Sequence, residues 1–250
     1  MKILITNDDS IYSPGIMALA KAAQHFGDVN VVAPDVEQSS MGHAVTHSRP
    51  ISLKKSPVVF EGMEAWRVNG TPGDCVALGT HIYNKTDLVL SGINMGYNLG
   101  NSMWHSGTLA GAKQGVLLGI KSIAFSTTVP KDGPDWMALA PHVDEALKML
   151  IEDAAFGLYN VNIPPNPKGV KWTRQSVRQY DGKIVPGVDP MGRKHYWFTV
   201  IPLEPADEGT DRWAIEHDFV SITPLRLDLT DEKMLKEILN RAPVESRPSH

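Results

Sequence analysis

Lys2-Ile3-Leu4-Ile5-Thr6-Asn7-Asp8-Asp9-Ser10 is the stretch that decides the fold. Its apolar residues predict a buried β-strand that stops at the Asn-Asp-Asp triplet. Ser13-Pro14-Gly15 then predicts the start of a helix, with Ser13 as the N-cap and Pro14 in the first helical position. The result is a strand–loop–helix unit with two adjacent carboxylates at the carboxyl end of its strand. Open α/β sheets bind their ligands at that edge.

The alternation of strand and helix patterns continues to about residue 165. The expected strands lie at 29–33, 87–90, 123–126 and 161–163. The expected helices lie at 14–26 (with Gly27 as C-cap), 74–81, 105–119 and 135–153. Because helices connect the strands, right-handed crossovers and parallel pairing are expected. The fold class is therefore α/β with a mostly parallel sheet.

The pattern changes after Pro164-Pro165. Alternating residues at 196–201 and 219–223 predict antiparallel strands, and no helix is expected between 166 and 227. We therefore divide the chain into a core over 1–165 and a C-terminal β extension over 166–250, which ends in an amphipathic helix at 231–239. Exposed aromatic residues in the extension, Tyr196 and Trp197, would suit an interface between subunits.

Composition excludes several classes of protein. The 250 residues carry a formal net charge of −4 without a long run of Lys or Arg, which argues against binding to a nucleic-acid polymer. The single cysteine, Cys75, excludes an intrachain disulfide and a Cys-cluster zinc site, and we expect it in the core. No signal-peptide pattern or membrane-length apolar run is present, so a cytoplasmic protein without membrane contacts is expected.

Oxygen ligands follow three of the expected strands. Asp8 and Asp9 follow the first strand, Ser39 lies in the loop after 29–33, and Asn94 follows 87–90. Two neighbouring carboxylates repel each other unless one is protonated or a cation lies between them. A hard divalent cation accepts carboxylate, amide and hydroxyl oxygens. The alternatives are a solvated acidic loop for the Asp pair and ordinary turn chemistry for Asn94.

Anion-binding groups follow in the next loop and helix. Asn98 lies in a Gly-rich loop and can offer an N–H to a phosphate, and Ser106-Gly107-Thr108 open the next helix, where free N–H groups attract anions. The alternatives are turn chemistry for Asn98 and helix capping for Ser106 or Thr108. A cation beside an anion site is the layout of phosphoester hydrolysis. His43 and His105 are candidates to serve the leaving group, with packing as the alternative.

Two other classes of protein remain as alternatives. A receiver-like signalling module also binds Mg²⁺ at an acidic pair after its first strand. It needs an acceptor Asp after the third parallel strand, but the strand at 87–90 runs into Ser-Gly-Ile-Asn. A non-hydrolytic nucleotide-binding protein usually has a Gly-rich first turn, where this chain has Asn7-Asp8-Asp9-Ser10.

Motifs along nearly the whole chain resemble those of the SurE (survival protein E) family, in the family's order. They are Asn7-Asp8-Asp9, the segments 33–39, 70–76 and 91–98, Ser106-Gly107-Thr108, and the segment 220–225. The resemblance implies a Rossmann-like three-layer core. It also implies a divalent-metal-dependent phosphatase, with one Mg²⁺ or Mn²⁺ per subunit, that acts on nucleoside 5′- and 3′-monophosphates.

The resemblance also implies roles for particular residues. It implies catalysis at Asp8 and Asp9, metal ligation by Asp8, Asp9, Ser39 and Asn94, and phosphate contacts by Asn98, Ser106, Gly107 and Thr108. Family members form dimers or tetramers through the C-terminal arm, so a homodimer or homotetramer is expected.

Besides a minor change at Gly73, where alanine is expected, three positions depart from the family pattern. Ser10 stands where members usually have glycine, so a positive φ there would strain the backbone; otherwise its hydroxyl would join the site. Gly209 stands where an acidic residue is expected, and Trp213 where a histidine is expected. These two changes put the geometry of the arm in question more than the chemistry.

Overall fold

A computed structural model describes residues 1–128, 130, 133–152, 155–177, 180–202 and 205–241. Its strands are β1 (Lys2–Thr6), β2 (Asp28–Pro34), β3 (Leu53–Lys55), β4 (Glu64–Val68), β5 (Leu88–Met95), β6 (Lys121–Thr127), β7 (Leu158–Ile163), β8 (Val170–Trp172), β9 (Tyr180–Val188), β10 (Lys194–Pro202) and β11 (Val220–Leu225). Its helices are α1 (Pro14–Ala23), α2 (Pro72–Tyr83), the 3₁₀ helix η1 (Gly100–Trp104), α3 (Gly107–Leu117), α4 (Trp136–Glu152), α5 (Asp211–Glu216) and α6 (Glu232–Arg241).

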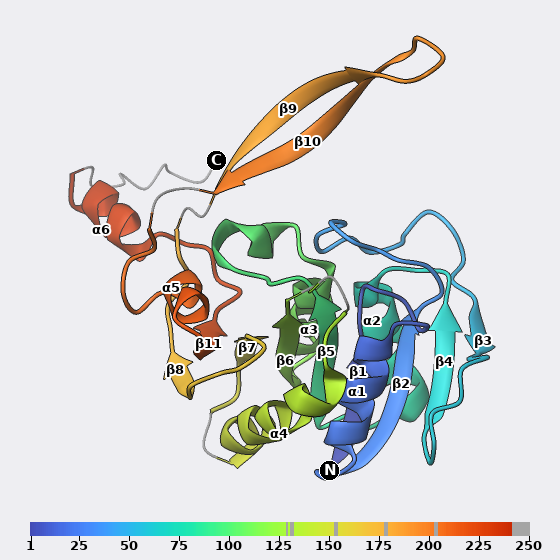
Figure 1. The fold of residues 1–250 in the computed structure, drawn as a ribbon. Helices are drawn as coiled ribbons and strands as arrows, with labels where there is room; N and C mark the ends of the chain where they lie inside the picture. Colours follow the sequence, from blue (N-terminus) through green and yellow to red (C-terminus); the bar gives the residue numbers. More distant parts are fainter. Residues whose placement is uncertain (129, 131–132, 153–154, 178–179, 203–204, 242–250) are drawn as a thin grey trace, which may run out of the picture.

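A nine-stranded sheet forms the middle layer, in the order β3-β4-β2-β1-β5-β6-β7-β11-β8 (Figure 1). Side chains of successive residues in β1 point to opposite faces. Ile3 and Ile5 pack into the cluster with residues of α1 and α4, whereas Leu4 packs with residues of α2. Helix α3 packs against β5 and β6. The expected α/β fold with a mostly parallel sheet is confirmed.

The order in which successive strands join the sheet reverses at β1. Strand β1 pairs in parallel with β2 on one side and with β5 on the other. The loops that leave the carboxyl ends of β1 and β5 therefore diverge toward opposite faces of the sheet. Such a switch point leaves a crevice at the strand ends, and the acidic pair follows β1 at this place.

The C-terminal part of the chain is more closely integrated with the core than expected. Strand β11 pairs antiparallel with β7 and parallel with β8, so the main sheet does not end at residue 165. Val220 and Ile222 are buried in the main core. The expectation of no helix between 166 and 227 is wrong, because Thr210 caps α5 by accepting from the N–H of Trp213.

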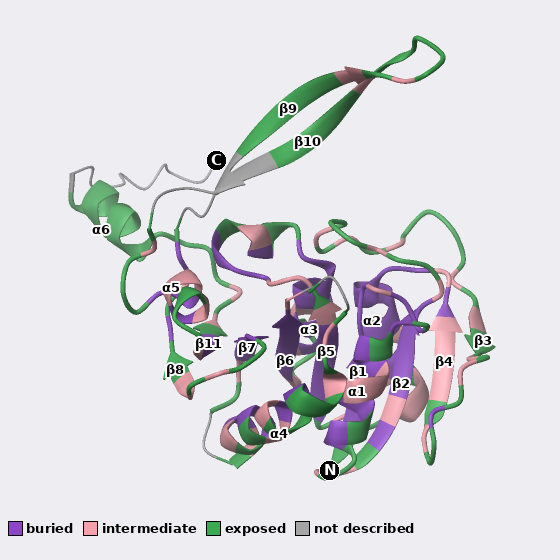
Figure 2. Ribbon diagram, in the orientation of Figure 1, coloured by how far each residue is buried: buried purple, intermediate pink, exposed green. Residues whose placement is uncertain are grey.

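The antiparallel extension expected from the sequence is the hairpin of β9 and β10, which we call the arm. The arm rises above the carboxyl ends of the parallel strands, away from the core (Figure 1). Its described side chains are mostly exposed, as is α6 (Figure 2). Tyr196 and Trp197 are about two-thirds exposed, at 66% and 64%. Residues 242–250 of the expected extension lie outside the described residues.

Helix α1 and strand β5 are among the elements whose boundaries differ from the sequence prediction. Helix α1 ends at Ala23 with Gln24 as its cap, three residues early. Gly27 does not cap the helix but allows the chain to pass close to Met1, because a Cβ on Gly27 would lie 2.2 Å from the carbonyl oxygen of Met1. Strand β5 continues to Met95, with a register shift against β6 between Ser91 and Asn94. Such irregularities redirect side chains at strand ends.

Among the described residues, no helix combines the length and apolar composition needed to cross a bilayer. Cys75 is buried as a free thiol, as expected.

Candidate active site

The two carboxylates after β1 lie in a partly dehydrated environment. Asp8 is only 4% exposed and Asp9 is half-buried. Burial raises the pKa of Asp8 from 3.8 to about 6; the hydroxyl of Thr108 lowers it in part, and the charge of Asp9 raises it further. Burial also raises the pKa of Asp9, although the N–H of Met95 donates to its Oδ2 at 3.1 Å. Ionising both groups is therefore costly unless a cation neutralises them.

A strained turn presents this pair. Ser10 has φ +78°, in the left-handed region that a β-carbon disfavours. The side-chain amide of Asn7 donates to the carbonyl of Ser10 at 2.8 Å, and the N–H of Ser13 donates to the same oxygen at 3.1 Å. Of the two possibilities given for Ser10, a strained positive φ is therefore the one found. The two hydrogen bonds to its carbonyl hold the turn in this conformation.

The amino end of α3 lies directly against Asp8. The hydroxyl of Thr108 donates to Oδ1 of Asp8 at 2.7 Å, and Ser106 caps the helix by accepting from the N–H of Leu109 at 3.0 Å. A Cβ on Gly107 would lie 2.7 Å from Cβ of Asp8 and 3.0 Å from the carbonyl oxygen of Gln38. Only glycine allows this approach. The free N–H groups of the first helical turn are thereby brought beside the acidic pair.

Asn98 is held on both its backbone and its side chain. Its N–H donates to Oδ1 of Asn162 at 2.9 Å, and its carbonyl accepts from the amides of Asn160 and Asn162 at 2.8 and 3.1 Å. Its side-chain amide donates to the hydroxyls of Ser126 at 2.8 Å and Thr108 at 3.3 Å. The N–H expected to contact phosphate is thus engaged within the protein. A hydrogen-bonded chain runs from Ser126 through Asn98 and Thr108 to Asp8.

Asn160 and Asn162 were not among the residues predicted for the site. Both are fully buried on β7, between apolar neighbours. The available signal was two Asn residues spaced by two in an otherwise apolar strand, which places both amides on one face. Buried amides of this kind require partners, and Asn98 in the loop after β5 provides them for Asn162 and for the side-chain N–H of Asn160, whereas Oδ1 of Asn160 has no partner among the described residues.

The remaining predicted ligands differ in how firmly they are held. The side-chain amide of Asn94 donates to the carbonyl of Gly96 at 2.7 Å, which leaves its Oδ1 as the group available to a cation. Ser39 is exposed, and its hydroxyl donates to Glu37 at 2.6 Å. The N–H of Gln38 donates to the carbonyl of Asp8 at 2.7 Å, which joins the Ser39 loop to the acidic turn.

A cleft of about 540 Å³ brings most of these residues together. Its lining includes five of the predicted site residues: Asp8, Ser39, Asn94, Asn98 and Ser106. Asp9, Gly107 and Thr108 are not in the lining, although Gly107 and Thr108 lie against Asp8. His105 lines the cleft, whereas His43 does not and instead pairs with Gln114 at 2.9 Å.

The residues present fit a hard divalent cation. Two carboxylates, an amide oxygen and a hydroxyl are the oxygen donors that Mg²⁺ and Mn²⁺ accept. No Lys or Arg belongs to the part of the cleft lining that the structure describes, so no basic side chain there neutralises the pair. The described residues also contain no group of three or more His, Cys, Asp or Glu that could hold a metal, so a cation at the Asp pair would also need neutral oxygens such as those of Asn94 and Ser39.

A family model described as "Survival protein SurE" matches residues 3–182. This chain belongs to the SurE family. It is 43% identical to 5′-nucleotidase SurE 1 of Thermus thermophilus, over 95% of this chain and 96% of that protein. It is 42% identical to 5′-nucleotidase SurE of Aquifex aeolicus, over 94% of this chain and 96% of that protein. The crystal structure of a SurE protein from Aquifex aeolicus superposes with a TM-score of 0.82 at 39% identity, covering 96% and 99% of the two chains. The resemblance seen in the motifs is confirmed.

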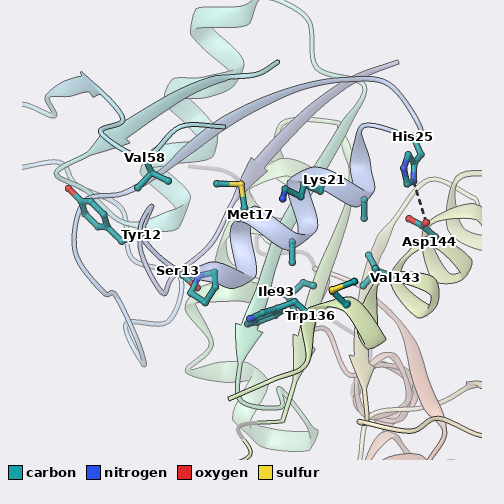
Figure 3. Close-up of a pocket in the computed structure, with 15 residues that line it drawn as sticks. Tyr12, Ser13, Met17, Lys21, His25, Val58, Ile93, Trp136, Val143 and Asp144 are labelled. Carbon is teal, nitrogen blue, oxygen red and sulfur yellow. Dashed lines mark ion pairs between the residues drawn. The ribbon is translucent and has the colours of Figure 1, made fainter. Parts of the chain in front are cut away.

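A second pocket in this SurE protein, also of about 540 Å³, lies between α1 and α4 (Figure 3). Tyr12 and Val58 lie at one end of it, and the His25–Asp144 ion pair, 3.2 Å long, lies at the other. Its lining is mainly apolar, and its one carboxylate is already paired. We therefore assign the chemistry to the polar cleft.

The two residues near the arm that depart from the SurE pattern, Gly209 and Trp213, have defined conformations and contacts in the structure. Gly209 has φ +82°, a conformation that favours glycine over an acidic residue. Trp213 stacks on the rings of His217 and Phe219. Asp211 is fully buried and accepts from the N–H of Gly100 at 2.8 Å, which ties α5 to η1 beside the cleft.

Proposed function

We propose that this SurE protein is a divalent-cation-dependent phosphomonoesterase that hydrolyses nucleoside 5′- and 3′-monophosphates to nucleoside and phosphate. The observation that carries the proposal is the acidic pair after β1, in which the buried Asp8 lines the polar cleft and meets the amino end of α3, with the half-buried Asp9 next to it in the chain. The 5′-nucleotidase names of relatives with 42–43% identity over nearly the full chain support it.

In this proposal, Asp8, Asp9, Ser39 and Asn94 hold one Mg²⁺ or Mn²⁺ per subunit. The cation supplies a Lewis acid that lowers the pKa of water and polarises a phosphate oxygen. Thr108 fixes Oδ1 of Asp8, so the orientation of that carboxylate is set before the cation binds. Such positioning reduces the reorganisation that the reaction would otherwise require.

The phosphate is bound by the protein's own donors. The N–H groups of Gly107 and Thr108 belong to the first turn of α3, ahead of the first intrahelical bond from Ala110 to Ser106. They offer positive potential to the phosphate oxygens without any basic side chain. Asn98 contributes by orienting Thr108, and its position beside the cleft keeps it near the phosphate. Asp8 and Asp9 are the candidates to accept the proton of the attacking water.

We further propose that the arm joins subunits into a dimer or tetramer. The exposed aromatic side chains of β10 support this role, since such residues are enriched at subunit interfaces. Light scattering after size-exclusion chromatography tests it. A monomer at micromolar concentration would contradict it.

Phosphate release from a panel of 5′- and 3′-nucleoside monophosphates tests the activity. Release with Mn²⁺ or Mg²⁺ that EDTA abolishes is expected, together with loss of release in Asp8→Asn. Asp28→Asn is the matched control, because Asp28 is an exposed carboxylate at the opposite end of β2. Cation binding without release from any monophosphate would contradict the proposal and favour a binding or signalling role.

A further inference from the structure

An aromatic side chain of the arm reaches the cleft. Phe198 on β10 is 69% exposed, yet it lines the same cleft as Asp8, Asn94 and Ser106. The arm rises from the edge of the sheet where the parallel strands end (Figure 1). Phe198 is therefore a wall of the proposed substrate site and contributes little to the core.

The position of the ring is set by a glycine on the neighbouring strand. Phe198 pairs with Ile184 in the register of the hairpin, and its ring lies across Gly182. A Cβ on Gly182 would lie 2.5 Å from Cζ and 2.9 Å from Cε2 of Phe198. Any larger residue at 182 would displace the ring. The hairpin thus holds an exposed aromatic ring against its own backbone, in a position where the ring borders the cleft.

The two parts of the cleft differ in chemistry. Asp8 and Ser106 are suited to a cation and a phosphate, and neither needs an aromatic neighbour. Phe198 offers a planar apolar surface, which suits a planar ring more than a sugar or a phosphate. A nucleotide has a charged end and a planar base, so it matches both parts. Stacking of a base on an aromatic side chain tolerates any base, because every base has a π-face.

We propose that Phe198 stacks on the base of the bound nucleotide and makes the enzyme prefer nucleotides over phosphomonoesters that lack a base. This inference rests on the proposed function, since it assigns the base to the site where the phosphate is cleaved. It also gives the arm a part in substrate binding, separate from any role in joining subunits.

The test compares 5′-AMP with ribose 5-phosphate, which has the same phosphate and sugar but no base. In Phe198→Ala, kcat/KM for 5′-AMP falls about 5- to 20-fold because KM rises. This loss is in the lower part of the range for removing a stacked aromatic ring, since the ring of Phe198 is exposed. The value for ribose 5-phosphate is unchanged. Phe198→Trp retains the wild-type preference. Gly182→Ala, which displaces the ring, shifts the preference in the same direction as Phe198→Ala.

Trp197→Ala is the matched control. Trp197 is an equally exposed aromatic residue on β10, but it is the neighbour of Phe198 and so points to the other face of the hairpin. It is expected to leave both substrates unaffected. Size-exclusion chromatography of each variant separates a change in assembly from a change in binding.

Equal losses for both substrates in Phe198→Ala, or no loss for either, would overturn the inference. Calorimetric binding of 5′-AMP and ribose 5-phosphate to the intact protein gives a readout that does not depend on turnover. If the wild-type protein cleaves neither compound, the proposed function fails. Phe198 is then still judged by whether its replacement by Ala weakens binding of 5′-AMP alone.

Discussion

Replacing Asp8 with Asn is expected to stabilise the metal-free protein. Burial and Asp9 raise the pKa of Asp8 from 3.8 to about 6, so the folded state binds the proton more tightly than the unfolded state. The favourable contribution of the protonated group is present below pH 3.8 and is lost as the pH rises through about 6. Above pH 6 the folded protein therefore bears the full cost of a buried carboxylate.

The magnitude follows from the two pKa values. The interval between 3.8 and about 6 corresponds to about 3 kcal/mol at about 1.4 kcal/mol per pH unit. Asn removes the charge and retains an oxygen that accepts from Thr108. At pH 7.5, chelator-treated Asp8→Asn should therefore unfold about 6–12 °C above the chelator-treated wild type. At pH 4 the gap should nearly vanish.

Thermal unfolding followed by circular dichroism, with EDTA and across pH 4 to 8, measures this difference. Asp28→Asn is the control of opposite sign, because the ammonium of Lys2 lies 2.6 Å from Asp28 and lowers its pKa. Saturating Mn²⁺ should raise the unfolding temperature of the wild type and leave Asp8→Asn unchanged. If the two metal-free proteins unfold at the same temperature at pH 7.5, or if their unfolding temperatures differ equally at pH 4 and pH 7.5, burial of the Asp8 charge is not the cause of the difference.

Three further substitutions test how the site is built. Ser10→Gly should relieve the strain of the left-handed backbone and stabilise the protein by about 1 kcal/mol, which raises the unfolding temperature by about 2–4 °C. Turnover should be unchanged, and a lower unfolding temperature would contradict the presence of strain at Ser10. Gly107→Ala should push α3 from Asp8 and lower phosphate release at least about tenfold, by analogy with the effect of small displacements at active sites. Gly157→Ala is its control, because the atom nearest to a Cβ on Gly157 lies 3.6 Å away. Equal phosphate release by the two alanine variants would contradict a role for the close approach of α3 to Asp8. Asn162→Ala should remove two hydrogen bonds to Asn98 and cost about 1–3 kcal/mol in urea unfolding, and a neutral result would mean that Asn98 is held elsewhere.

Local sequence patterns were sufficient for the first βα unit. The apolar run in β1, the acidic turn and the Ser13 cap all depend on neighbouring residues, and the structure reproduces each of them. The conformation of Ser10 was foreseen as one of two outcomes because a β-carbon stands where the family has glycine.

Long-range pairing could not be read from the same patterns. An alternating strand such as β11 suits a hairpin and the edge of the main sheet equally well, and only its register with β7 decides between them. The hydrogen bond that the hydroxyl of Thr108 donates to Asp8 was not predicted, because Asp8 lies 100 residues earlier in the chain. The two Asn residues of β7 were overlooked because their partner, Asn98, lies more than sixty residues away.

In the proposed mechanism, a cation held at Asp8 and Asp9 makes phosphate release possible. The most direct measurement titrates Mn²⁺ into metal-stripped protein while electron paramagnetic resonance follows the bound ion and phosphate release from 5′-AMP is recorded on the same samples. Release is expected to rise in parallel with the binding of one Mn²⁺ per subunit, and Asp8→Asn is expected to show neither binding nor release. Release that is already complete before Mn²⁺ binds, or that persists in Asp8→Asn, would rule this mechanism out.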